Sequence, residues 1–91
     1  SEIPELYTLS QNYPNPFNPS TKFNYSIQKE GYGSLKIYDV HGKAVKTYFE
    51  GFKKAGEYNE EFDAGELTSG IYFCKLILNE VSITRKMILL K

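Results

Sequence analysis

Apolar and polar residues alternate along most of the chain, and a turn-forming residue interrupts the alternation about every ten residues. In the clearest run, Phe23, Tyr25 and Ile27 are separated by single polar residues. A period of two puts every second side chain on one face of a strand, and no segment shows the period of about 3.6 residues that marks a long helix. The pattern therefore predicts an all-β protein.

The alternation divides into about seven predicted strands, the number found in an immunoglobulin-like sandwich. They cover residues 6–9, 22–27, 35–40, 44–52, 58–62, 71–78 and 81–90. The apolar positions change phase after Ile37, which predicts a β-bulge or burial on both faces. Gly42 suits a tight turn because glycine accepts a positive φ. For 91 residues we expect one domain, an immunoglobulin-like antiparallel β-sandwich, with residues 1–5 as a linker from a longer secreted protein.

Residues 63–70 form a predicted corner before the strongest predicted strand, residues 71–78. Gly70 ends the corner, and Tyr72 stands two residues before Cys74. In immunoglobulin-like sandwiches, a tyrosine at this spacing donates a hydrogen bond to upstream backbone and fixes the corner. Cys74 is the only cysteine, which excludes an internal disulfide, and its apolar surroundings predict a small buried hydrophobic residue.

Charge and hydropathy argue against two classes of partner. Eleven basic residues balance eleven acidic ones, whereas proteins that bind nucleic acid usually carry a basic excess that neutralises phosphates. No apolar run reaches the ~18 residues that a membrane-spanning helix needs. We therefore expect no nucleic-acid partner and no membrane span.

No arrangement of catalytic or metal-binding residues is apparent in the sequence. His41 is the only histidine and follows Asp39 by two residues in a predicted turn, which favours a solvated group over a general base. Acidic residues gather between positions 57 and 66, but their spacing matches no calcium loop, and a solvated strand face explains them better. We predict no enzyme activity, no cofactor, no catalytic residue and no metal site.

The most unusual segment is QNYPNPFNPST, residues 11–21. Its prolines lack backbone N–H groups, so it cannot be a central strand. Asparagine side chains can hydrogen-bond nearby backbone and replace the missing ladder partners. We expect Tyr13 and Phe17 to plug one open end of the sandwich. The structural residues predicted from this opening motif and from the turns are Asn12, Tyr13, Pro14, Asn15, Pro16, Phe17, Asn18, Pro19, Gly42, Gly70 and Tyr72.

The last predicted strand ends in KMILLK, residues 86–91. An apolar strand between two lysines suits either the core or an exposed edge that another protein extends by strand addition. The residues alone favour the core.

Several motifs in this chain resemble, in the same order, those of the type A C-terminal sorting domains of the type IX secretion system. Residues 9–21, LSQNYPNPFNPST, resemble the start of such domains. Residues 37–43, IYDVHGK, look like the family's hairpin, Gly56 like the glycine of its Ala-Gly turn, and residues 67–72, LTSGIY, like its corner. The ending KMILLK is similar to the family's closing basic-apolar-basic signature.

The resemblance implies a non-catalytic sorting signal at the end of a larger exported protein. The implied partners are an N-terminal cargo domain, the outer-membrane type IX translocon and a cell-surface sortase-like peptidase. The implied route runs through the periplasm of a Gram-negative bacterium to the cell surface or medium. The candidate residues for recognition by the translocon are Lys86, Met87, Ile88, Leu89, Leu90 and Lys91.

Two alternative functions stay open at this point. An accessory carbohydrate-binding module of a secreted hydrolase would expose coplanar aromatic rings, although core or hairpin packing explains most of the available ones better. These are Tyr32, Tyr48, Phe49, Phe52 and Tyr58. A hook-capping-like domain shares the opening motif, but such domains tend to carry a Trp-Asp-Gly turn where residues 62–65 of this chain read FDAG.

Overall fold

The computed structural model describes residues 6–91, so the expectation of a linker at residues 1–5 lies outside the described residues. The described chain contains seven strands and no helix. The strands are β1 (Tyr7–Leu9), β2 (Ser20–Ile27), β3 (Gly31–Tyr38), β4 (Ala44–Lys53), β5 (Gly56–Asp63), β6 (Gly70–Leu78) and β7 (Val81–Leu89). All seven predicted strands are present, and the predicted all-β class is confirmed.

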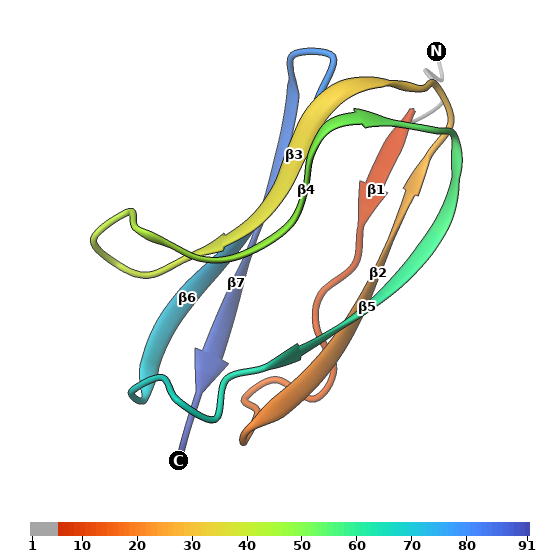
Figure 1. The fold of residues 1–91 in the computed structure, drawn as a ribbon. Coiled ribbons are helices and arrows are strands. Elements are labelled where there is room, and N and C mark those ends of the chain that lie inside the picture. The colour runs from red at the N-terminus through yellow and green to blue at the C-terminus, as the bar shows by residue number, and fades with distance from the viewer. Residues whose placement is uncertain (1–5) are drawn as a thin grey trace, which may run out of the picture.

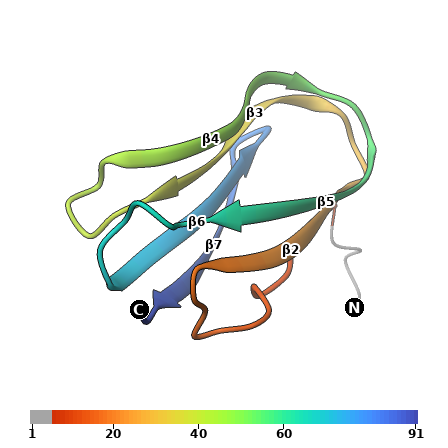
Figure 2. The ribbon, with the colours of Figure 1, turned by 60° about the horizontal axis from the view of Figure 1, so that its bottom comes forward.

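The strands form two antiparallel sheets that face each other (Figure 1). One sheet has the order β1-β2-β5, and the other has the order β4-β3-β6-β7. Figure 2 shows β6 and β7 side by side in one layer and β2 in the other. The predicted sandwich of immunoglobulin-like character is therefore confirmed.

The core lies between the two sheets and is built from the inward half of each alternating strand. On β2, Phe23, Tyr25 and Ile27 are buried, while the polar residues between them are more exposed. Removing these apolar surfaces from water stabilises the sandwich by roughly 1.5–3 kcal/mol for each large side chain. The buried apolar residues are Tyr7, Leu9, Phe17, Phe23, Tyr25, Ile27, Leu35, Ile37, Phe62, Ala64, Tyr72, Cys74, Leu76, Leu78, Met87 and Leu89.

The change of apolar phase in the second long strand corresponds to an irregular pairing. The register of β3 against β4 shifts between Leu35 and Lys36 and again between Ile37 and Tyr38, which confirms the predicted bulge. In the turn that follows, Gly42 has a φ of 82°. The Asp39 carboxylate accepts hydrogen bonds from the backbone N–H groups of His41 and Lys43. These bonds hold the pKa of Asp39 below its ordinary value, and the bond from Lys43 has the larger effect.

The predicted corner before β6 is also present. The hydroxyl of Tyr72 donates a 2.7 Å hydrogen bond to the backbone carbonyl of Thr68, as expected for a tyrosine that fixes such a corner. Cys74 is buried on the same face of β6. Burial raises the pKa of its thiol to about 12, because the low-dielectric core disfavours the thiolate. Both predictions for this segment are confirmed.

Candidate recognition site at the terminal strand

Strand β7 lies at the edge of the four-stranded sheet, and β6 is its one partner among the seven strands of the described chain. In an antiparallel ladder, both backbone polar groups of one residue point to the same side, and those of the next residue point to the other side. Met87 and Leu89 stand opposite Tyr72 and Gly70 of β6, whereas Ile88 bonds on the open side of the strand. The sequence left open whether this strand belongs to the core or to an exposed edge, and β7 is both: it contributes side chains to the core and lies at the edge of its sheet.

The six candidate recognition residues separate into two groups. Met87 and Leu89 point into the core and are almost completely buried. Lys86 and Lys91 are exposed, Ile88 is half-buried, and Leu90, directly after the strand, is 56% exposed. The Lys91 ammonium donates a 2.6 Å hydrogen bond to the carbonyl of Gly65. Four of the six side chains can therefore meet a partner while the other two anchor the strand.

The opening motif covers the open edge of this same segment. The backbone N–H of Phe17 donates to the carbonyl of Ile88 at 2.9 Å, and the N–H of Leu90 donates to the carbonyl of Phe17 at 3.0 Å. The Asn15 side-chain oxygen accepts from the N–H of Ile88 at 2.9 Å. Gln11 donates from its amide to the carbonyl of Lys86 at 2.6 Å. The edge between Lys86 and Leu90 is thus already paired within the molecule.

Phe17 holds the opening motif in this position. Its side chain is only 2% exposed and its ring lies 6.0 Å from that of Phe62. Asn12, at the start of the same motif, is also buried, and its amide donates to the Thr21 hydroxyl and to the carbonyl of Pro14. The peptide bonds before Pro14, Pro16 and Pro19 are cis. The predictions that Phe17 plugs the sandwich and that an asparagine supports the loop backbone are confirmed.

Tyr13 does not plug the sandwich, and that prediction is wrong. Its side chain is 83% exposed. The backbone of Tyr13 exchanges hydrogen bonds with Lys22 at 2.8 and 3.1 Å, which prolongs the pairing with β2. In this extended segment neighbouring side chains alternate between faces, and Asn12 takes the inward position, so Tyr13 points to solvent.

The first half of the β7 edge is open among residues 6–91. Like those of Ile88, the backbone N–H and C=O groups of Ser82 and Thr84 point away from β6. No hydrogen bond within the described chain reaches these groups of Ser82 and Thr84. The Arg85 guanidinium donates to the carbonyl of Leu9 at 2.8 Å and so links the edges of the two sheets.

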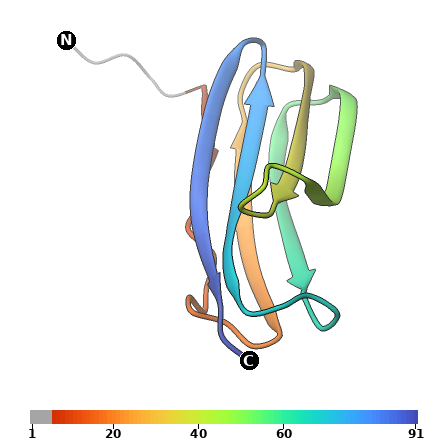
Figure 3. The ribbon, with the colours of Figure 1, turned by 90° about the vertical axis from the view of Figure 1, so that its left-hand side faces the viewer.

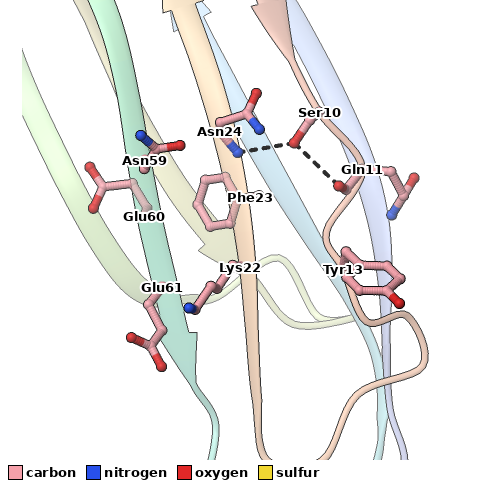
Figure 4. Close-up of a pocket in the computed structure, with 9 residues that line it drawn as sticks. All are labelled: Ser10, Gln11, Tyr13, Lys22, Phe23, Asn24, Asn59, Glu60 and Glu61. Atoms are coloured by element: carbon pink, nitrogen blue, oxygen red, sulfur yellow. Dashed lines mark hydrogen bonds between the residues drawn. The ribbon is translucent and has the colours of Figure 1, made fainter.

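A separate hollow of about 540 Å³ lies on the outer face of the other sheet, beside β2 and β5 (Figure 4). Tyr13, Lys22, Asn24 and Asn59 are among its lining residues. The Ser10 hydroxyl oxygen accepts from the N–H of Asn24 at 3.0 Å.

The aromatic residues considered for a carbohydrate site do not form one exposed plane. Tyr58 stacks on the buried Tyr25, with ring centroids 5.0 Å apart, and Phe49 stacks on the same ring at 6.2 Å. Tyr32 and Phe52 are exposed, but their rings are inclined at 68°. Stacking on a sugar ring requires a flat platform, which this pair does not offer.

The remaining candidates for chemistry are isolated. His41 is exposed in the turn before Gly42. Within residues 6–91 no three His, Cys, Asp or Glu side chains come together in a way that suits a metal ion. The same residues include no helix long and apolar enough to cross a membrane.

The contact between residues 15–17 and 88–90 is the part of the site that sequence reasoning missed. Strand alternation gives the inward and outward residues of each segment, but it does not tell which distant edge a proline-rich loop will cover. The one available signal is Asn15, because an asparagine between two prolines has a free side-chain acceptor for an unpaired N–H.

Comparison with known proteins gives one match. A family model described as the secretion system C-terminal sorting domain matches residues 11–90. The matched range starts in the opening motif and ends in the candidate recognition segment. No curated protein and no solved structure matches the chain.

Proposed function

The chain belongs to the family of type IX secretion system C-terminal sorting domains, and from this membership we propose that residues 1–91 act as one non-catalytic address for a larger cargo protein. The domain would direct its cargo through the outer-membrane translocon to the cell surface or medium. The family supplies the sorting role.

The observation that carries the proposal is that residues 86–91 include both buried side chains, which anchor the strand, and exposed ones, which a partner can reach. The buried side chains of Met87 and Leu89 fix the strand against the core, while Lys86, Leu90 and Lys91 stay exposed. A partner that binds these exposed side chains meets a strand whose backbone is already paired with β6, so little backbone conformational entropy is lost on binding. We assign recognition to Lys86, Ile88, Leu90 and Lys91, and strand anchoring to Met87 and Leu89.

The assignment of a non-catalytic role rests on the two groups best suited to chemistry. The raised pKa of Cys74 keeps its buried thiol protonated at neutral pH, whereas a nucleophilic cysteine needs a lowered pKa and access to solvent. His41 lies in an exposed turn and Asp39, its neighbour, is committed to backbone N–H groups. Cys74 is therefore not placed to act as a nucleophile, and His41 is not placed to act as the base that would activate one.

The proposed partners follow from the same role. An N-terminal cargo domain would precede this one in the chain and carry the separate signal for passage into the periplasm of a Gram-negative bacterium. The translocon would then bind the folded domain, and a cell-surface sortase-like peptidase would act after export.

The test is to fuse residues 1–91 behind a reporter that is directed to the periplasm of a host with a working type IX system. We expect the reporter at the cell surface or in the medium, and in the periplasm when the domain is omitted. A fusion that stays in the periplasm, while another sorting domain exports the same reporter, would overturn the proposal.

A further inference from the structure

Strand β6 carries apolar side chains on both of its faces. Tyr72, Cys74 and Leu76 point into the core, whereas Ile71, Phe73 and Ile77 point to the outer face of the sheet. The outer face of a two-layer sandwich is ordinarily polar, and apolar surface exposed there marks an interaction site. This face is turned to the viewer in Figure 3, with β7 and β6 in front.

The register places these outward residues directly beside those of the terminal strand. Phe73 stands between Tyr38 of β3 and Lys86 of β7, and Ile71 stands opposite Ile88. The outer strip, defined as Tyr38, Ile71, Phe73, Ile88 and Leu90, therefore continues the candidate recognition segment across three strands. Ile71 is 39% exposed, so the strip is open to a partner.

Lysines border the outer strip. Lys86 lies in the row of Phe73, and Lys36 and Lys75 lie opposite each other in the next row. Lys36 forms an ion pair with Glu50 at 3.1 Å. No ion pair within residues 6–91 involves Lys75 or Lys86. A shallow hollow of about 430 Å³ runs beside Phe73 and Lys75 and includes Asp39, whose carboxylate is committed to backbone N–H groups.

We propose that the translocon docks on the outer strip with an apolar surface rimmed by carboxylates, and that Tyr38, Ile71 and Phe73 belong to the address together with the exposed residues of β7. This inference rests on the proposed sorting function. The lysines that border the outer strip select the occupant, because carboxylates complement Lys75 and Lys86, whereas a second copy of this chain would bring lysines against lysines.

Recognition is by side chains of this face and not by addition of a strand to the edge. Strand addition needs unpaired backbone N–H and C=O groups, and from Lys86 to Leu90 the opening motif already pairs with them. A partner strand there would have to displace the segment that the buried Phe17 side chain anchors.

The decisive comparison uses the same substitution at two positions of the same face of the same strand. Ile71→Thr changes the outer strip, and Ile77→Thr changes the far end of β6 and serves as the matched control. Both retain a β-branched side chain. We expect Ile71→Thr to bind the detergent-solubilised translocon about tenfold more weakly than wild type, and Ile77→Thr to bind as wild type does.

A second pair of variants distinguishes recognition by side chains of the sheet face from strand addition at the sheet edge. Thr84→Pro removes an outward N–H that has no partner within residues 6–91 and so blocks strand addition at the open part of the edge. Lys86→Glu reverses a charge of the face, with Lys54→Glu at the far β4–β5 turn as its control. We expect export to survive Thr84→Pro and Lys54→Glu and to fall with Lys86→Glu. Thermal melting of each purified domain shows which variants fold.

The outcomes are distinguishable from failure of the sorting function itself. If the wild-type fusion is not exported, the proposed function fails. If the wild type is exported and Ile71→Thr binds and exports equally well, the outer strip is not part of the address. Loss of export by a folded Thr84→Pro variant would establish edge pairing instead. A dimer of the wild-type domain that Ile71→Thr dissociates would assign the strip to a second copy. If Thr84→Pro does not fold, the two isoleucine variants decide.

Discussion

The backbone N–H of Phe17 donates a 2.9 Å hydrogen bond to the carbonyl of Ile88. This bond joins the opening motif to the last strand, the two segments of the chain that are most distinctive in sequence. Because the side chain of Phe17 is buried, the core holds the motif, and the motif in turn covers the edge of the strand. The segment proposed as the address is therefore fixed from both sides, by β6 and by the opening motif.

The two aromatic residues of the opening motif should differ sharply in their effect on stability. Phe17→Ala leaves a cavity beside Phe62 and should lower the free energy of unfolding by about 3–5 kcal/mol. Tyr13→Ala removes an exposed ring and should change it by less than about 0.5 kcal/mol. Urea unfolding of both variants measures the difference. Equal losses in the two variants would contradict the assignment of Phe17 as the anchor.

Asn15 should protect the terminal strand locally. Its side-chain oxygen accepts the N–H of Ile88, so Asn15→Ala should speed hydrogen exchange at the Ile88 amide about fivefold to tenfold, the equivalent of a hydrogen bond of about 1 kcal/mol. Asn18→Ala, at an exposed position of the same motif, is the control and should leave that amide unchanged. Exchange followed by NMR gives the answer. An Ile88 amide that is equally protected in both variants would show that Asn15 is dispensable.

The corner before β6 should depend on one hydroxyl. Tyr72→Phe deletes the donor to Thr68 without creating a cavity and should lower the free energy of unfolding by about 0.5–1.5 kcal/mol. Tyr32→Phe makes the same chemical change at an exposed position and should have no measurable effect. Chemical denaturation compares the two, and equal stability of both variants would contradict the role of the hydroxyl.

Stability should fall at alkaline pH because of Cys74. Burial raises the pKa of its thiol to about 12 in the folded state, above the value of about 8.5 expected in the unfolded chain. Between these two values the unfolded state loses a proton that the folded state keeps, so the free energy of unfolding decreases as the pH rises. The raised pKa values of the partly buried Tyr25 and Tyr48 act in the same direction at higher pH.

Denaturation between pH 7 and pH 10.5 tests this dependence, with Cys74→Ala as the control. The variant should be less stable at pH 7 but should lose less of its stability between about pH 8.5 and pH 10. Parallel loss in the wild type and in the variant would exclude Cys74 as the source.

The strands, the corner and the bulge were predictable from the sequence because each depends on local physics. Alternation of apolar residues sets the inward face of β2 and β6, and the change of phase at Ile37 marks the irregular pairing of β3. The role of Tyr72 follows from its spacing relative to Gly70 and Cys74. The error at Tyr13 also has a local cause, because Asn12 and Tyr13 are neighbours in an extended segment and only one of them can point inward.

The contact of the opening motif with β7 was not predictable, because the local sequence pattern of neither segment indicates the other as its partner. Asn12 takes the inward position only because Thr21 and the carbonyl of Pro14 satisfy its amide. The outer strip has a similar origin. The sequence shows that β6 is apolar at successive positions, but only the register against β3 and β7 places Tyr38, Phe73 and Lys86 in one row.

The most direct measurement of the central claim is the fraction of a periplasmic reporter that residues 1–91 carry to the cell surface or medium when one exposed leucine is changed. Leu90 is 56% exposed at the end of β7, and Leu6 is 44% exposed beside β1. Because neither side chain is buried in the core, both serine variants should fold with nearly wild-type stability. We expect Leu90→Ser to leave the reporter in the periplasm and Leu6→Ser to export it as the wild type does. Equal export by the two variants would contradict the assignment of the address to the terminal strand.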